Sequence, residues 1–419
     1  MPALTRRDWL SMTLMSGGAW AAPAFSTRQV GPPEGGPDAR EERVSRIRAI
    51  IDTFEKQGFH RTATEVDRAS ADWLSREVEQ AGLTPAREAF SVDRVDLVDV
   101  AVVARERRIV GVPLFDAAFT GEAGVAGRLG EMGGDAPIGL TQLAPNAAGA
   151  GPLGAARRAS RHRAIVCVTR GGRPGLCPSN ADAFEQPFGP PVVQVSSEEA
   201  AFLDDCAKRG VDVVVRAQVS RTPSHAFNVV TQIAGADGTL PPLIVMTPRS
   251  GWWTCASERG GGIACWLELM RELRAARPAR DVLFVASSGH ELGHLGINAF
   301  INRRPGIVSR SVGWIHFGAN IGAAQDPGNT LQASDDGFEA MLADAMQAAG
   351  LHIDRRVARG TVPGGEAEAV HRGGGRYLSI IGRNALFHNQ ADRGPDAVDP
   401  GAIARFIDVF TAVAKRLAS

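Results

Sequence analysis

The sequence predicts an α/β fold, a mixed central sheet flanked by helices, with a β-rich domain inserted into it. From residue 223 onward, short apolar runs alternate with amphipathic helical patterns, an order typical of a sheet covered by helices. Between residues 106 and 222 the chain changes to loops rich in Gly, Pro and Ala separated by compact apolar runs, which is typical of an inserted β domain. The 419 residues leave room for two domains, and 44% hydrophobic with 22% charged residues is an ordinary globular composition.

The first part of the main domain is expected over residues 42–105. Apolar residues recur at helical spacing over 42–58 and again over 65–82, so two amphipathic helices should open the domain. Residues 85–104 then turn to short alternating or apolar runs, which predict strands.

The insert is expected over residues 106–222. Apolar runs at 164–168 and 191–195 predict two of its strands. A helical pattern at 197–210 and a strand pattern at 211–215 should close it.

The second part of the main domain is expected over residues 223–419. Three apolar runs predict strands, at 227–230, 243–246 and 281–288. Helical patterns lie between and after them, at 260–275, 291–303, 336–350 and 400–418. Strands and helices that alternate in this way predict the sheet with helices on its faces.

The N-terminus predicts export. Paired arginines, Arg6 and Arg7, precede a moderately apolar stretch that ends in small residues near Ala24, an order that resembles a twin-arginine signal peptide over residues 1–24. Residues 25–41 are rich in Pro and Gly and are expected to form a flexible linker. No later apolar run is long enough to span a bilayer, so a periplasmic or secreted protein without a stable membrane span is expected after signal removal.

Charge and cysteine content exclude some partners and leave one question open. Forty-six basic residues balance forty-six acidic ones, so no net field favours nucleic acid or an anionic membrane. The five cysteines contain no C-x-x-C pair. Cys167 and Cys177 either form a bridge in an oxidising compartment or remain buried thiols.

Residues 290–294 match the zinc-protease pattern H-E-x-x-H, with His290, Glu291 and His294. That mechanism requires both histidines on one face of a regular helix. Here the motif directly follows an apolar run and Gly289, and Gly293 lies inside it, so it opens at the end of a predicted strand. An H-E-x-x-H zinc protease therefore stays an alternative.

Three segments follow one another between residues 242 and 304: residues 247–250 come after one apolar run, a glycine-rich loop lies at 258–264, and residues 290–296 come after the next apolar run. Two later segments lie at 314–318 and 387–392. In this order they resemble the di-zinc aminopeptidases, metallopeptidase family twenty-eight, which has a strand ending in His-x-Asp, a glycine-rich loop with a bridging Asp, a strand ending in Glu-Glu and two further ligand segments. The resemblance implies the aminopeptidase-like fold, and the insert resembles the protease-associated domain that several members have at this position.

The resemblance also implies a reduced metal site. The family's first His falls on Thr247 or the next residue, its catalytic Glu falls on His290, and its later Asp falls on Gly318. Three ligand types survive or are conservatively replaced, in Glu258, Glu291 and His388. These could hold one zinc ion rather than two, with His290 and Glu291 as catalytic groups; a site without metal is the remaining alternative.

Other candidates follow from position. The family's orienting Asp falls on Arg249 or Ser250, and Trp252 and Trp253 follow directly, so Arg249 and the two indoles could line a substrate pocket. Weaker candidates are His294, His316 and Cys255, for which ordinary packing is the competing interpretation.

Together these features predict an exported metal-dependent hydrolase of peptides or other amides. The alternative is a catalytically inactive pseudopeptidase, which keeps the fold but binds a ligand or partner. It is motivated by the loss of ligand types at Thr247 and Gly318. The sequence names neither the substrate nor the oligomeric state.

Overall fold

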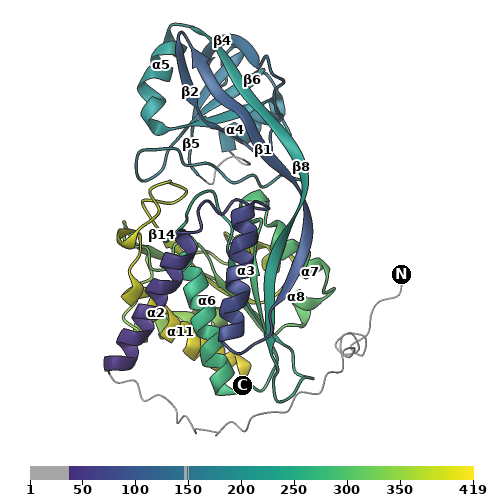
Figure 1. Cartoon of the computed structure of the whole chain (residues 1–419), viewed down its shortest axis with the longest axis vertical. Helices are drawn as coiled ribbons and strands as arrows, with labels where there is room; N and C mark the ends of the chain where they lie inside the picture. Colours follow the sequence, from purple (N-terminus) through teal and green to yellow (C-terminus); the bar gives the residue numbers. More distant parts are fainter. Residues whose placement is uncertain (1–36, 146–148, 150) are drawn as a thin grey trace, which may run out of the picture. The chain divides into compact units, whose positions relative to one another are not determined.

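The computed structural model describes residues 37–145, 149 and 151–419 (Figure 1). By its contacts the chain divides into Met1–Ala39 and a compact unit, Arg40–Ser419, which contains both the main domain and the insert. The predicted signal peptide, 1–24, lies outside the described residues. Of the predicted linker, 25–41, the last five residues are described, and they already belong to a helix.

The main domain is built on a mixed sheet, as the sequence predicts. Four parallel strands form its centre, in the order β14 (Tyr377–Arg383), β11 (Gly313–Phe317), β9 (Leu243–Pro248) and β10 (Val282–Ser287). Antiparallel strands flank them, with β8 (Asp212–Ile233) beside β10 and β12 (Gly328–Ala333) beside β14, and β13 (Arg355–Arg356) lies at the edge. The carboxyl ends of the four central strands therefore meet at one edge of the sheet.

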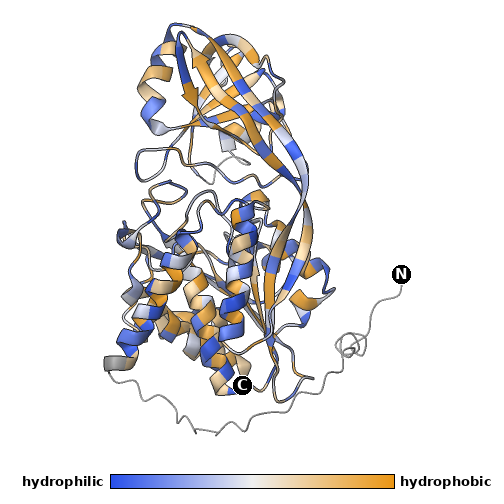
Figure 2. Cartoon of the chain, viewed as in Figure 1, coloured by the Kyte–Doolittle hydropathy of each residue, from blue (hydrophilic) through white to orange (hydrophobic). Residues whose placement is uncertain are grey.

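Helices cover both faces of this sheet. One face packs on α2 (Pro37–Glu55), α3 (Glu65–Gln80), α6 (Gly260–Ala276), α9 (Asp336–Ala348) and α11 (Pro400–Ala418). The other packs on α7 (Leu295–Asn302), α8 (Ile307–Arg310) and α10 (Ala367–Arg372). Successive strand residues alternate between the two cores, as Val245 and Met246 do, because side chains in a strand point to opposite faces. Figure 2 shows apolar residues along the strands of the sheet and many polar residues along the helices α2 and α3.

A long two-stranded ribbon joins the main domain to the insert. Strand β1 (Ala86–Ala104) pairs antiparallel with β8 from Ala86 opposite Val230 to Ala104 opposite Val213, with one irregularity between Leu97 and Asp99. The sequence predicts separate short strands here, at 211–215 and 227–230, and that division is wrong. The polar stretch between them stays extended because it is paired with β1 along its length.

The insert is β-rich, with its own apolar clusters. Its other strands are β2 (Arg107–Val110), β3 (Val112–Pro113), β4 (Val125–Glu131), β5 (Ile138–Leu143), β6 (Ala164–Thr169) and β7 (Val192–Val195). Its helices are α4 (Gly151–Ala159) and α5 (Ala200–Lys208), the second preceded by a 3-10 turn at Ser197–Glu199. The predicted strands at 164–168 and 191–195 are confirmed.

Most predicted helices of the main domain are confirmed as α2, α3, α6, α9 and α11. The exception is 291–303. A 3-10 turn, His290–Leu292, comes first, and α7 starts only at Leu295. Gly293 and His294 take left-handed backbone conformations, with φ of 79° and 60°, and so interrupt the helix.

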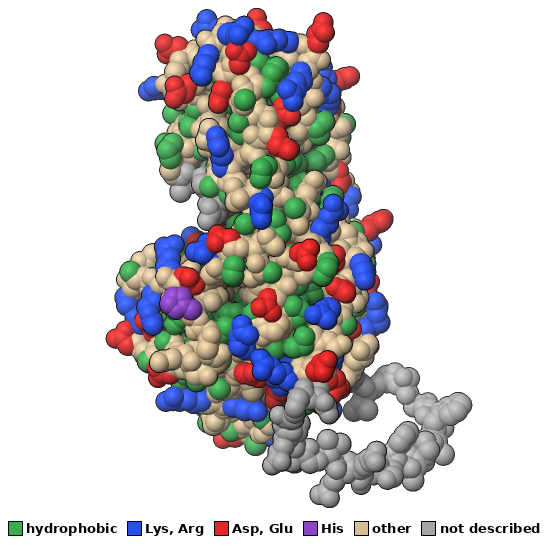
Figure 3. Space-filling view, turned by 90° about the vertical axis from the view of Figure 1, so that its left-hand side faces the viewer, with side chains coloured by type: hydrophobic (Ala, Val, Ile, Leu, Met, Phe, Trp, Pro, Cys, Tyr) green, Lys and Arg blue, Asp and Glu red, His purple; other side chains and the backbone are tan. Residues whose placement is uncertain are grey.

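Within the described part of the chain, no helix combines the length and the apolar character needed to cross a bilayer. Basic and acidic side chains of the described residues are interspersed on the face drawn in Figure 3. All five cysteines are free and buried, so Cys167 and Cys177 do not form a bridge.

Candidate functional site

The candidate site lies at the sheet edge where β9, β10 and β11 end. The segments that leave these strands carry Glu258, the His290–His294 motif and Gly318. Helix α6 begins directly after Glu258 and Arg259 with three glycines, and its first turn lies close to neighbouring backbone. A Cβ on Gly261 would lie 1.9 Å from the carbonyl oxygen of Ile321, so only glycine lets the helix approach this closely.

Glu258 and His388, two of the predicted ligands, are brought together. His388 Nε2 lies 3.5 Å from Glu258 Oε1, and both side chains are buried. The His388 Nδ1 atom lies 2.6 Å from the carbonyl oxygen of Pro178, to which it donates, because a carbonyl can only accept. The predicted pairing of these two distant segments is thus present in the fold.

Arg259 adds a buried cation to this pair. Its Nη2 lies 2.8 Å from Glu258 Oε1, and its Nε donates to the carbonyl oxygen of Ser250 at 2.6 Å. Burial alone raises the pKa of Glu258, but the Arg259 guanidinium and His388 outweigh it and lower that pKa to about 2. Sequence reasoning missed Arg259, although it directly follows a candidate ligand.

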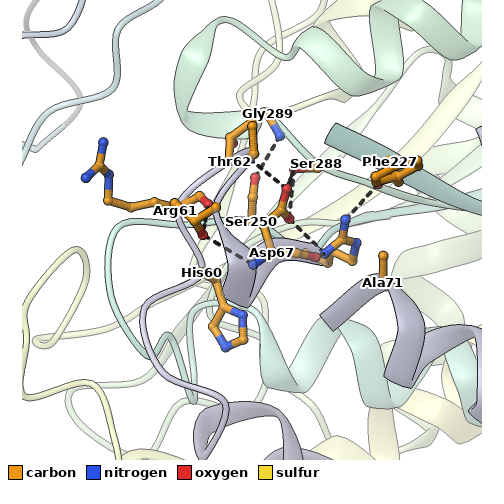
Figure 4. Close-up of polar contacts among 12 residues, drawn as sticks. His60, Arg61, Thr62, Asp67, Ala71, Phe227, Ser250, Ser288 and Gly289 are labelled. Atoms are coloured by element: carbon orange, nitrogen blue, oxygen red, sulfur yellow. Dashed lines mark hydrogen bonds and ion pairs between the residues drawn. The ribbon is translucent and has the colours of Figure 1, made fainter. Parts of the chain in front are cut away.

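Glu291 is held elsewhere. Its Oε1 accepts hydrogen bonds from the backbone N–H and the hydroxyl of Thr62, at 3.0 and 2.6 Å, and its Oε2 accepts one from Ser250 Oγ at 2.7 Å. Ser250 Oγ in turn accepts from the backbone N–H of Gly289 at 2.8 Å (Figure 4). Both carboxylate oxygens are therefore used in joining three segments of the chain.

Arg249 forms the second buried ion pair of this region. Its Nη1 lies 2.8 Å from Asp67 Oδ1, and its Nη2 donates to the carbonyl oxygen of Phe227 at 2.7 Å. Ser288 Oγ donates to the same Asp67 carboxylate, as Figure 4 shows. The guanidinium is 1% exposed and turned to these partners, which is a structural arrangement and not the substrate clamp that the sequence suggests.

The two tryptophans also pack against other parts of the chain. Trp252 contacts Phe115 of the insert, with ring centroids 4.9 Å apart, and its Nε1 donates to Asn180 Oδ1 at 3.2 Å. Trp253 Nε1 donates to the carbonyl oxygen of His388 at 2.7 Å. Both indoles are at least nine-tenths buried and hold the insert and the C-terminal segment against the site.

A cavity of about 710 Å³ opens at this sheet edge, and neither Glu258 nor Arg259 is among the residues that line it. Its wall includes His290, His294 and His316, and Asp182 of the insert. Asparagines and arginines also line it, at Asn180, Asn320, Asn329, Asn384, Arg355 and Arg383. Burial is the main cause that lowers the pKa of His290 well below its usual value, with Arg259 and His294 adding to it, so the ring is neutral at neutral pH and a weak proton acceptor.

The remaining candidates differ in exposure to this cavity. His316 lies at the cavity wall, and burial lowers its pKa to about 4. Cys255 lies 3.6 Å from Glu258 Oε2, and burial, with the nearby Glu258 and Asp392 charges, raises its pKa well above the usual value, so the thiol is not a ready nucleophile.

The zinc set that the resemblance implies, Glu258, Glu291 and His388, does not fit this geometry. Glu291 has both oxygens bonded to other groups, and Arg259 already neutralises Glu258 and would repel a metal cation beside it. Across residues 37–145, 149 and 151–419, no three His, Cys, Asp or Glu side chains stand ready to hold a metal ion. The regular helix that an H-E-x-x-H protease requires is absent at residues 290–294.

Comparison with known proteins gives structural neighbours and no sequence relatives. No family model and no curated protein sequence matches the chain. Among solved structures, a zinc aminopeptidase from Bacillus subtilis aligns with a TM-score of 0.73 and 15% identity, over 90% of this chain and 94% of that one. An aminopeptidase from Aneurinibacillus aligns with a TM-score of 0.68 and 13% identity, over 90% and 94%. A Peptidase M28 precursor from Shewanella amazonensis aligns at 0.70 and 14%, over 91% and 96%. At these identities the likeness shows the fold alone, which confirms the predicted aminopeptidase-like architecture.

Proposed function

We propose that this chain, with its aminopeptidase-like fold, binds a peptide or small amide in the cavity lined by His290, His294 and His316, without hydrolysing it through a zinc centre of the kind that the resemblance implies. The observation that carries the proposal is the buried Glu258–Arg259 pair, 2.8 Å apart. A guanidinium beside the carboxylate supplies the positive charge there, and Glu291 is engaged by Thr62 and Ser250. This function corresponds to the pseudopeptidase alternative that the sequence leaves open.

The cavity lining supports a ligand of the peptide class. Asparagine side chains offer both donors and acceptors for amide groups, and Phe387 supplies an apolar surface. Arg355 at the wall can pair with a carboxylate end of a peptide, whereas Arg383 is already paired with Asp326. We also propose export by the twin-arginine route, on the basis of the N-terminal sequence alone.

A second candidate is hydrolysis of an amide within the same cavity. The observation that favours it is the group of three histidines at the cavity wall, together with Glu368. Hydrolysis there would use groups other than Glu258, Glu291 and His388.

The test combines binding with cleavage. Di- and tripeptides are titrated into the purified full chain by calorimetry, and the same mixtures are followed by mass spectrometry for hydrolysis. Arg355→Ala should weaken binding of a peptide with a free carboxylate at least tenfold, relative to its amide, whereas Arg209→Ala, an exposed arginine outside the cavity lining, should leave it unchanged. Cleavage that chelators abolish, and that Glu258→Gln removes while circular dichroism shows the variant to be folded, would sink the proposal in favour of the predicted hydrolase.

A further inference from the structure

The wall of the cavity is a row of side chains that crosses four neighbouring strands. His316 of β11 is in register with Ser379 of β14. Two residues further along β14, Ile381 is in register with Thr330 of β12, which is in register with Arg355 of β13. Side chains that are opposite each other, or two residues apart on one strand, point to the same face of a sheet. The row from His316 to Arg355 therefore lies on one face, and its members at β11, β14, β12 and β13 all line the cavity.

The segment before α10 closes the His316 end of this row. A Cβ on Gly365 would lie 2.8 Å from the His316 ring, and the φ of 68° at this position also favours glycine. The backbone N–H of Gly364 donates to Gln332 Oε1 at 2.7 Å, and Gln332 Nε2 donates to the Gly364 carbonyl oxygen at 3.1 Å. His316 is therefore fully buried under this segment, whereas Arg355, at the other end of the row, is exposed.

An acidic side chain of the insert lies at the opposite end of the cavity from Arg355. Asp182 is exposed and lines the cavity. A Cβ on Gly293 would lie 2.6 Å from the Asp182 carbonyl oxygen, so Asp182 lies beside the turn that follows β10. Strands β10 and β13 are at opposite ends of the run β13-β12-β14-β11-β9-β10. The carboxylate and the guanidinium therefore lie at different ends of one cavity.

These two charges are available to a ligand. Within the part of the chain that the structure describes, neither Asp182 nor Arg355 forms an ion pair. The other charged side chains of the wall already have partners: Glu368 pairs with Arg372, Arg383 pairs with Asp326, and Asp354 accepts a hydrogen bond from the backbone N–H of Asn329. The cavity thus offers one unpaired negative and one unpaired positive group.

The strand order sets the distance between the two ends. Strand β13 is three strand steps from β11 and five from β10. Neighbouring strands lie about 4.8 Å apart, so the span from Arg355 is roughly 14 Å to the β11 end and roughly 24 Å to the β10 end. An extended peptide advances about 3.3 Å per residue, so this span corresponds to about four to seven residues.

We propose that the ligand is a peptide of about four to seven residues with both termini free, its carboxylate at Arg355 and its ammonium at Asp182. This inference rests on the proposed function, peptide binding in this cavity, and adds the length and the direction of the ligand. A guanidinium can donate two hydrogen bonds to a carboxylate, and an ammonium pairs with the Asp182 carboxylate. A shorter peptide reaches only one of the two groups, and a longer one gains nothing further, because affinity from two linked contacts is highest when the linker matches the span.

The test is a length series with capped ends. Alanine–serine peptides of two to ten residues are titrated into the purified full chain by calorimetry at pH 7. We expect affinity to rise at least tenfold from two residues to an optimum at four to seven, without a further rise. At the optimum, C-terminal amidation should weaken binding at least tenfold in the wild-type chain and less than twofold in Arg355→Gln. N-terminal acetylation should weaken it at least threefold in the wild-type chain and less than twofold in Asp182→Asn.

Matched controls are Arg310→Gln and Glu185→Gln, which change exposed residues outside the cavity lining and should respond to both caps as the wild-type chain does. Affinity that is the same at all lengths, or insensitive to both caps, would overturn the inference and leave peptide binding intact. Sensitivity to acetylation that disappears in Arg355→Gln instead of Asp182→Asn would overturn the direction. Absence of binding at every length would defeat the proposed function itself, and this inference with it. Circular dichroism shows whether each variant is folded.

Discussion

At the residue scale, the site is dominated by charges buried against each other. Glu258 pairs with Arg259, and Asp67 pairs with Arg249, and all four side chains are about 1% exposed. A charge of this kind is costly once its partner is removed, because water cannot replace the partner. The residues that sequence analysis assigned to substrate and metal are therefore also residues on which folding depends.

Replacing Glu258 tests this directly. Glu258→Gln leaves Arg259 without its counter-charge and should lower the free energy of unfolding by about 3 to 5 kcal/mol. Asp205→Asn, which removes the shared partner of the exposed Arg105 and Arg209, is the control and should have a much smaller effect, because water screens both pairs. Urea denaturation measures both. The double variant Glu258→Gln, Arg259→Met should lose less than the sum of the two single losses. A strictly additive result would mean that the two side chains do not stabilise each other.

His60 gives a pH signature. Its ring stacks on Phe54 at 3.7 Å, and its pKa is lowered to about 3, chiefly by burial and also by Arg249. Since its unfolded pKa is about 6.5, the unfolded chain takes up the proton first as pH falls, and stability drops between pH 6.5 and 3 by on the order of 1.4 kcal/mol per pH unit from this group. His60→Gln should remove that part of the slope when unfolding is measured at several pH values. An unchanged slope would show that His60 does not titrate on unfolding.

At the scale of elements, close backbone approach places the site. Helix α6 brings Gly261 against Ile321 and so fixes Glu258 and Arg259 at its start. The turn at His290–Leu292 and the left-handed His294 direct both imidazoles of the motif to one cavity. Both arrangements depend on where the glycines lie in the sequence and on which segments of the chain pack against them.

Gly261→Ala should destabilise the chain by about 2 to 3 kcal/mol, because the new methyl group overlaps the Ile321 carbonyl. Gly337→Ala, in helix α9, is the control, since its added methyl group would lie 3.3 Å from the nearest atom, and it should stay within about 1 kcal/mol. Thermal unfolding compares them. Equal effects of the two substitutions would contradict the close approach at α6.

At the scale of the whole molecule, the insert and the main domain share the site. Ala181 N–H donates to the carbonyl oxygen of Glu291 at 2.9 Å, and Asn180 and Pro178 accept from Trp252 and His388. The β1–β8 ribbon is continuous through both. Separation of the insert from the main domain would therefore break these hydrogen bonds and expose Glu291, Trp252 and His388.

We expect a single cooperative unfolding transition in calorimetry, with equal calorimetric and van't Hoff enthalpies, because these contacts and the ribbon couple both parts. Asn180→Ala, which removes one of the contacts, should lower the midpoint without splitting the transition. Two resolved transitions in the wild-type chain would contradict the coupling.

The helices and strands of the main domain were predictable from local pattern. Apolar spacing places α6 and α11 within a residue or two, and the run that becomes β10 is visible as a short apolar segment. The continuous ribbon was not, because residues 216–226 are largely polar and become a strand only through pairing with β1. Local propensity does not contain that pairing.

The sequence by itself determined the order of elements, the sheet with its helices, and the candidates that would meet at one sheet edge, because periodicity and turn residues are local. Only the tertiary structure decided which charges neutralise which. Thr62 and Glu291 are 229 residues apart in the chain, and Asp67 and Arg249 are joined across 182 residues. Whether Glu291 faces a metal or a threonine depends on how these distant segments pack against each other. The sequence of one segment alone does not determine contacts with a segment about 200 residues away.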